Sequence, residues 1–414
     1  MVDFFSNVPD IVIDTILEKL PIRMAAQTSV LSKQWRQAWL SLQHLRFDSG
    51  FQEQQKNKDG SCDWRKNSRI ISSILLHHRG HVRDFILYVP DDADEDHMNL
   101  SQWISFLSQN GIQKVIISNW DCKVFITPYI FRCSDLVYLS LGNFSLNPPP
   151  SCFHGFPKLT YLSLVDFKFS RPNIFLSLIE NCKMLATLRL DTWSGMDHVV
   201  IDSPRLQTLI IKGEFDSLAF RNVRSLKSIS LCLKTMPKKV LTVETVDAIN
   251  HLASSCQLQS IHFEGYLCQL LAAGGAVRSP PVTFNHLNEL RLSNLNLSKF
   301  DVFRYLLSMI ECCPYIKKLD ISVIPGEKVG LGGHIFDLNY KYKLDRLRVV
   351  NIEGITGSSA ELKLVEYVLA ISASLENLFF KSGKCDTDSE RKMSRALMRF
   401  PRASPKASLV CLDT

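Results

Sequence analysis

A six-residue pattern, Leu-x-x-Leu-x-Leu with some Ile, Val or Phe replacements, recurs along most of this 414-residue chain. Successive side chains of a β-strand point to opposite faces, so the apolar residues of each copy share one face. One copy cannot bury that face alone, and stacked copies can. The pattern therefore predicts an α/β solenoid whose short parallel strands line a concave side. The copies begin at Val82, Ile112, Leu136, Leu159, Leu185, Leu206, Leu226, Leu258, Leu287, Ile316, Leu344 and Leu375.

The spacing of these copies, roughly 20 to 30 residues, is that of a leucine-rich repeat. Segments with helical spacing between the strands are expected to form the convex layer: Ile174–Cys182, Thr245–Ser255 and Val302–Cys312. The remaining strand positions point outward, and they include Arg346 and Arg348 in the copy at Leu344. Exposed Tyr and Arg commonly anchor interfaces. Four outward residues are therefore predicted to contact a protein target: Tyr138, Tyr161, Arg189 and Arg291.

Residues 8–39 have a different pattern, that of three short helices. Pro21 ends the first helix, the second is expected over Arg23–Leu31, and Ser32 is placed to cap the third. Three helices of this size cannot bury so many large apolar groups, so part of their surface must meet a partner. The first helix opens with Pro9 and carries its apolar residues at helical spacing: Ile13, Ile16, Leu17 and Leu20.

Composition excludes several classes of protein. With 46% apolar and 21% charged residues, the chain can bury a large core in two or three units. No apolar run approaches the length of a membrane span, and the acidic N-terminus does not resemble a secretory signal. The net charge of +7 comes without a long basic block, so nucleic-acid binding is not indicated. Twelve scattered cysteines without a Cys-x-x-Cys pair suggest free thiols, and hence nucleus or cytoplasm.

No catalytic, metal or cofactor motif stands out. In the cluster His77, His78 and His81, the first and last would share a helical face as metal ligands do. A general-base Glu between them and a further ligand nearby are missing, and Gly80 should break the helix. The acidic run Asp91–Asp96 lacks the pattern of a calcium loop and is expected to be solvated. Cysteines that precede repeat strands are expected to be buried: Cys133, Cys182, Cys256 and Cys313.

The N-terminal helices resemble a plant F-box. The similarity rests on Val8-Pro9, the Ile-Leu-x-x-Leu-Pro of Ile16–Pro21, and Thr28–Lys33 with the tryptophans that follow. Val8 stands where the family usually has Leu. The resemblance implies docking to a Skp-type adaptor, which joins a cullin scaffold and a RING subunit. Matched position by position, it implies these adaptor contacts: Val8, Pro9, Ile13, Ile16, Leu20, Pro21, Val30 and Leu31.

The last 70 residues or so resemble the FBD module that closes many plant F-box/leucine-rich-repeat proteins. The resemblance includes Phe400-Pro-Arg-Ala-Ser-Pro-Lys-Ala407, in which the Phe-Pro-Arg-Ala-Ser-Pro run is the most specific part. Ser408–Leu412 is expected to be a strand that covers an end of the solenoid. The expected domains are an F-box at 1–47, a linker and helix at 48–81, leucine-rich repeats at 82–343 and an FBD at 344–414.

Together these resemblances imply a substrate receptor of a Skp–cullin–F-box (SCF) ubiquitin ligase that performs no chemistry itself. Two alternatives stay open. The chain could be an F-box scaffold that holds partners without promoting ubiquitination, or an enzyme built on the repeats, which the missing catalytic motifs disfavour. The sequence does not decide whether a small-molecule co-ligand is used.

Overall fold

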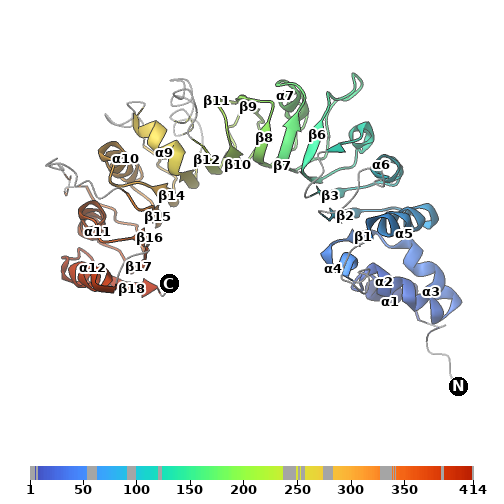
Figure 1. The fold of residues 1–414 in the computed structure, drawn as a ribbon, viewed down its shortest axis with the longest axis horizontal. Coiled ribbons are helices and arrows are strands. Elements are labelled where there is room, and N and C mark those ends of the chain that lie inside the picture. The colour runs from blue at the N-terminus through green and yellow to red at the C-terminus, as the bar shows by residue number, and fades with distance from the viewer. Residues whose placement is uncertain are drawn as a thin grey trace. The chain divides into compact units, whose positions relative to one another are not determined.

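The structure is a computed structural model (Figure 1). It divides into two compact units, residues 1–196 and 197–414. Each unit is described by itself. The described residues are 5, 8–53, 63–90, 99–119, 124–235, 249, 252, 257–273, 283–326, 338, 340, 342–383 and 387–412.

The N-terminal unit begins with three short helices: α1 (Asp10–Leu17), α2 (Ile22–Gln27) and α3 (Lys33–Ala38). Pro9 is the N-cap of α1 and not its first residue. The hydroxyl of Ser32 accepts a hydrogen bond from the Trp35 amide, so the predicted cap of α3 is confirmed. The predicted second helix was too long. It passes at Thr28 into a 3₁₀ turn, where the Thr28 hydroxyl donates to the carbonyl of Ala25 at 2.6 Å.

A parallel sheet follows, with α5 (Trp64–His77), α6 (Leu100–Gln109) and α7 (Ile174–Ile179) between its strands in sequence. Its first strand, β1 (His44–Phe47), was not predicted. It pairs with β2 (Asp84–Val89), and His44 lies opposite Asp84. Two short strands, β4 (Val124–Phe125) and β6 (Phe144–Leu146), pair with each other, and β6 also pairs with residues Lys168 and Phe169 of the sheet. The main strands are β1 (His44–Phe47), β2 (Asp84–Val89), β3 (Lys114–Asn119), β5 (Tyr138–Gly142), β7 (Tyr161–Phe169) and β8 (Thr187–Ser194).

The polar segment after β1 is more ordered than its composition predicted. Residues Ser49–Glu53 form the helix α4, and α5 begins at Trp64, within the stretch that was expected to be a linker and a helix. Two aromatic side chains explain the difference, because Phe51 packs edge-on to Phe47 and Trp64 packs edge-on to Trp103. The run Asp91–Asp96 lies outside the described residues.

The C-terminal unit also combines a parallel sheet with helices that lie between its strands in sequence. A two-stranded parallel sheet, β9 (His198–Asp202) with β11 (Ser217–Arg221), accompanies the main sheet. Helices α9 (Gly265–Ala273), α10 (Phe300–Glu311), α11 (Ser359–Ile371) and α12 (Thr387–Arg399) lie on one side of that sheet (Figure 1). Its strands are β10 (Thr208–Gly213), β12 (Ser228–Leu233), β13 (Ser260–Glu264), β14 (Glu289–Leu295), β15 (Lys318–Val323), β16 (Val349–Ile355), β17 (Asn377–Ser382) and β18 (Ser408–Leu412).

The predicted strand register is confirmed in ten of the copies from Ile112 to Leu375, where the strand starts two residues after the first apolar residue. For the copy at Leu344 the predicted register is wrong, because β16 starts three residues later than the pattern indicates. Val349 lies opposite Lys318, so the outward residues of β16 are Val349 and Asn351. Arg346 and Arg348 instead precede this strand. The expected helix Thr245–Ser255 lies almost entirely outside the described residues, and the strand expected at Ser408–Leu412 pairs with β17.

Candidate binding surfaces

The N-terminal helices expose large apolar side chains that a folded protein usually buries. Val30 is 84% exposed and Ile11 is 75% exposed. Such side chains lie on α1, on α2, and on the 3₁₀ turn Thr28–Val30 with the residue that caps it. We refer to them together as the N-terminal apolar surface: Ile11, Val12, Ile16, Met24, Val30 and Leu31.

Most of the predicted adaptor contacts lie at the surface, but Ile13 does not. Pro9, Ile16, Pro21, Val30 and Leu31 are exposed, and Val8 and Leu20 are half-buried. Ile13 is fully buried, and so is Leu17 one helical turn later. The prediction of Ile13 as a contact is therefore corrected: its side chain belongs to the core face of α1. The opposite face carries Ile11 and Val12, which fall outside the predicted stripe and were missed.

Polar contacts hold the start of α1 in place. The side-chain amide of Gln34 donates to the carbonyl of Val8 at 3.0 Å and to the carboxylate of Asp10 at 2.6 Å. The indole N–H of Trp35 donates to the carbonyl of Phe5 at 3.1 Å. The apolar surface of α1 is thus presented on a helix whose first turn is fixed to α3.

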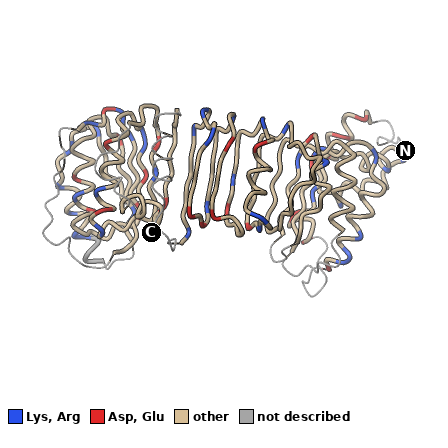
Figure 2. Tube along the Cα trace, turned by 90° about the horizontal axis from the view of Figure 1, so that it is seen from above, with Lys and Arg blue, Asp and Glu red and all other residues tan. Residues whose placement is uncertain are grey.

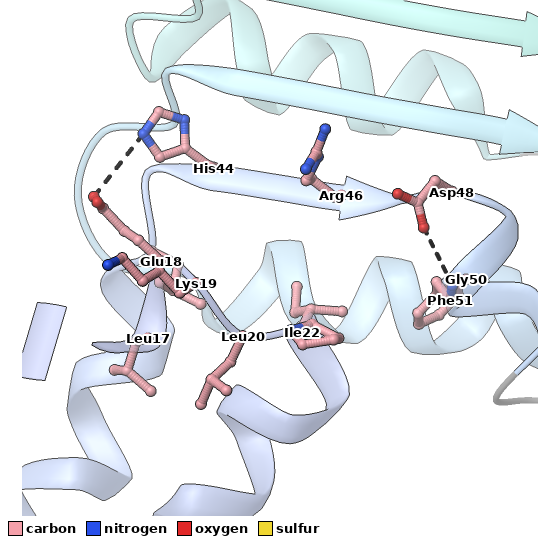
Figure 3. Close-up of a pocket in the computed structure, with 12 residues that line it drawn as sticks. Leu17, Glu18, Lys19, Leu20, Ile22, His44, Arg46, Asp48, Gly50 and Phe51 are labelled. Carbon is pink, nitrogen blue, oxygen red and sulfur yellow. Dashed lines mark hydrogen bonds and ion pairs between the residues drawn. The ribbon is translucent and has the colours of Figure 1, made fainter. Parts of the chain in front are cut away.

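A cavity lies where α1 meets β1, and sequence reasoning did not find it (Figure 3). His44 connects the two sides of this junction, with its ring 3.9 Å from Glu18 and 2.9 Å from Asp84. On the far side, the Asp48 carboxylate accepts from the Phe51 amide. These contacts tie the end of α1 to the first two strands. The lining residues include Leu17, Glu18, Lys19, Leu20, Pro21, Ile22, Leu42, His44, Arg46, Asp48, Gly50 and Phe51.

On the open sheet face of the N-terminal unit, two of the predicted target residues come together. The rings of Tyr138 and Tyr161 stack with centroids 4.0 Å apart and an interplanar angle of 3°. The ammonium of Lys114 lies 5.1 Å from the Tyr138 ring. Burial, followed by the effects of Tyr161, raises the pKa of Tyr138 to about 12, so the phenol stays neutral. Arg189 lies on the next strand and pairs with Asp191 at 3.1 Å.

In the C-terminal unit, the fourth predicted residue is part of a charged network. The Arg291 guanidinium donates to the Asp320 carboxylate through Nε at 3.2 Å and Nη2 at 2.8 Å. Lys318 bridges Asp320 and Glu289, each at 2.9 Å. Asn351 donates to the second Asp320 oxygen at 2.6 Å. Arg291 therefore presents a guanidinium that is already oriented by its neighbours.

Asp320→Asn is expected to lower the free energy of unfolding by about 1–2 kcal/mol at pH 7, because charged hydrogen bonds are lost while the partners stay partly solvated. Burial raises the pKa of Asp320, but hydrogen bonds from Lys318, Arg291 and Asn351 outweigh it and hold this pKa below its usual value. The stabilisation is therefore present at neutral pH and lost as the pH falls below about 4.

Urea titrations of the wild type and this variant at several pH values check the expectation. The difference between them should shrink towards acid. A difference that stays constant with pH would show that the carboxylate's charge does not contribute.

The described residues contain no cluster of metal ligands, and the thiols that precede the repeat strands are buried. No group of three or more His, Cys, Asp or Glu in this part of the chain could hold a metal ion. His77 and His78 instead bond to the carbonyls of Ser73 and Leu42. Burial raises the pKa of Cys133 to about 12 and that of Cys182 to about 11, which keeps these thiols protonated. The prediction that they are buried is confirmed, Cys313 included; Cys256 lies outside the described residues.

Comparison with known proteins gives a consistent picture. A family model for the leucine-rich repeats of the FBD-associated F-box protein At5g56370 matches residues 100–251. The F-box/FBD/LRR-repeat protein At1g13570 of Arabidopsis thaliana is 30% identical over 419 residues, which cover 99% of this chain and 99% of the relative. The chain belongs to the F-box/FBD/LRR-repeat family. A second F-box relative, the FBD-associated F-box protein At1g66310 of Arabidopsis thaliana, is 25% identical over 99% of this chain and 96% of its own length.

The fold agrees with this family. The F-box/FBD/LRR-repeat chain is an α/β leucine-rich-repeat solenoid with an N-terminal helical F-box, as predicted. Among solved structures, an LRR protein of Leptospira interrogans covers 91% of both chains at 12% identity with a TM-score of 0.34. In the described part of the chain, no helix has the length and apolar character needed to span a bilayer. The domain boundaries at 47, 81 and 343 stay predictions.

Proposed function

We propose that this F-box/FBD/LRR-repeat protein is the substrate-recognition subunit of an SCF ubiquitin ligase. Its F-box would bind a Skp-type adaptor and, through it, a cullin-RING assembly. Its repeats would bind a protein target. The receptor itself carries out no chemistry, and it acts by raising the effective concentration of target lysines near the charged ubiquitin carrier. Its place of action would be the nucleus, the cytoplasm or both.

The N-terminal apolar surface is the observation that carries this proposal. Ile16, Val30 and Leu31 are both predicted adaptor contacts and exposed apolar side chains. Their burial by a partner would gain about 25 cal/mol for each Å² removed from water. The fixed first turn of α1 means that little ordering would be needed on binding.

Reconstitution tests the proposal directly. The full chain, mixed with a Skp-type adaptor, a cullin and a RING subunit, should enter the complex and promote ubiquitin transfer to proteins that its repeats capture. Capture without transfer, together with unchanged target levels after depletion of this chain in cells, would favour the scaffold alternative. Turnover of a substrate by the isolated chain would instead revive the enzyme alternative.

Target capture is expected to weaken at least tenfold when Tyr138, Tyr161, Arg189 and Arg291 are all changed to alanine. The first two rings form a rigid stacked pair, and both guanidiniums are held by carboxylates, so each presents its contact surface at low entropic cost. A pull-down of a validated target measures the effect, with adaptor binding as the control for folding. Unchanged capture would move the target site away from these residues.

A further inference from the structure

A basic groove lies at the edge of the C-terminal unit where the strands β15 to β18 begin. It has a volume of about 590 Å³. Four cations line it together with two acids, so the groove is net positive: Lys317, Arg346, Arg348 and Lys406, with Asp345 and Glu376. It is separate from both the F-box and the strand positions discussed above. Figure 2 shows basic and acidic residues mixed along the trace of this unit, so a groove lined mainly by cations differs from its surroundings.

Tight turns build the groove. Asp345-Arg346, Ala373-Ser374 and Pro405-Lys406 occupy equivalent turns that precede β16, β17 and β18. The last turn is held by Ser404, whose buried hydroxyl donates to the carbonyl of Leu375 at 2.6 Å. Arg402 donates to the carbonyl of Ala407 at 2.7 Å and closes the same turn. The last two residues of the predicted Phe-Pro-Arg-Ala-Ser-Pro motif of the FBD, Ser404 and Pro405, therefore line one side of the groove together with Lys406.

The cations of the groove are poorly neutralised. Among the described residues, neither Lys317 nor Lys406 makes an ion pair, and both are exposed. The Arg346 guanidinium lies over the ring of Tyr315 at 4.7 Å, which orients it without cancelling its charge. Arg348 approaches Glu376 only at 3.8 Å, and both side chains are at least half exposed. Lys317, Arg346 and Lys406 are thus available to an anionic ligand, and Arg348 is only weakly paired.

We propose that this groove binds an acidic peptide segment of a partner protein in extended conformation. Strands β15, β16, β17 and β18 pair in that order, so about 14 Å separates the two ends of the groove. An extended peptide rises about 3.3 Å per residue and would cross it in four to five residues. Carboxylates at every second position would face Lys317, the Arg346–Arg348 pair and Lys406 in turn.

The charge pattern favours a peptide over a nucleic acid. A polynucleotide presents a continuous row of phosphates, whose binding rests on many Lys and Arg contacts. Here Asp345 and Glu376 interrupt the cations, and the second of these lies between Arg348 and Lys406 along the sheet. A peptide in which acidic and neutral residues alternate fits this interrupted row of cations. This proposal does not depend on adaptor binding, because the groove lies outside the F-box.

Fluorescence anisotropy with the full chain tests the proposal. The probe is a labelled nine-residue peptide of alternating Glu and Ser, and its neutral counterpart has Gln in place of Glu. The Glu peptide should bind, the Gln peptide should bind at least tenfold more weakly, and raising NaCl from about 50 to about 300 mM should weaken binding severalfold. The double variant Arg346→Glu, Lys406→Glu should lose at least tenfold in affinity.

The matched control is Lys183→Glu combined with Arg224→Glu, since both residues occupy equivalent exposed turns of other repeats. This control should bind the Glu peptide as the wild type does. Thermal melts of both double variants should match the wild type, because all four positions are exposed.

Three results would overturn the proposal: no binding of the Glu peptide at low salt, equal losses in the two double variants, or equal binding of the Gln peptide. Tighter, equally variant-sensitive binding of a single-stranded RNA of the same charge would assign the groove to nucleic acid instead. None of these results would bear on the F-box, whose adaptor binding is measured separately.

Discussion

Ile16→Asp combined with Val30→Asp is expected to abolish capture of a Skp-type adaptor while the chain stays folded. Ile16 is 41% exposed and Val30 is 84% exposed, so neither carries much of the core, and two solvated carboxylates should cost the free protein little. In an apolar interface the same carboxylates would be desolvated at a cost of several kcal/mol. Affinity should therefore fall by more than a hundredfold, measurable by calorimetry with purified adaptor.

A control with matched exposure separates a local effect from a general one. Met184 is 39% exposed and Met398 is 55% exposed, and neither lies on the F-box. Met184→Asp combined with Met398→Asp should leave adaptor affinity within threefold of the wild type. If Ile16→Asp, Val30→Asp binds as tightly as the wild type and melts normally, the adaptor does not dock on the N-terminal apolar surface, and the ligase proposal loses its main support.

The main strands of the repeats could be predicted because their apolar alternation is strict. The predicted register was wrong in the copy at Leu344, where the same leucines allow two alignments of the pattern. Leu344-x-x-Leu347-x-Val349 and Leu347-x-x-Val350-x-Ile352 both fit the pattern, and only pairing of Val349 with Lys318 decides between them. The strand His44–Phe47 was missed because four residues carry little alternation, and its partner β2 lies about 40 residues away.

The binding surfaces were less predictable because they depend on which face of an element meets the rest of the molecule. Helical spacing grouped Ile13 with Ile16, but Ile13 is fully buried and Ile16 is 41% exposed. The Arg291–Asp320 pair joins residues on neighbouring strands, and no local pattern announces it. The basic groove likewise assembles turns from separate repeats. Such juxtapositions follow from the stacking of repeats and not from any single segment.

Glu361→Ala is expected to lower the free energy of unfolding by about 3 kcal/mol, the largest effect of any single substitution considered for the C-terminal unit. One oxygen of the buried Glu361 carboxylate accepts from the amides of Thr356, Gly357 and Ser358 at 2.8–2.9 Å. The Glu361 amide in turn donates to the Ser358 hydroxyl, which completes a capping box at the start of α11. Alanine would leave three backbone donors without their acceptor.

The turn has no easy way to relax. Gly357 has φ +87°, and a Cβ there would lie 3.2 Å from Cβ of Met393 in α12, so the turn is held between two helices. Glu361→Gln keeps one acceptor oxygen and should cost only about 1 kcal/mol. Glu366→Ala, in the same helix, should change stability by less than about 0.5 kcal/mol. Urea unfolding ranks the three variants, and equal losses for Glu361→Ala and Glu366→Ala would mean that the capping box contributes nothing beyond ordinary helix propensity.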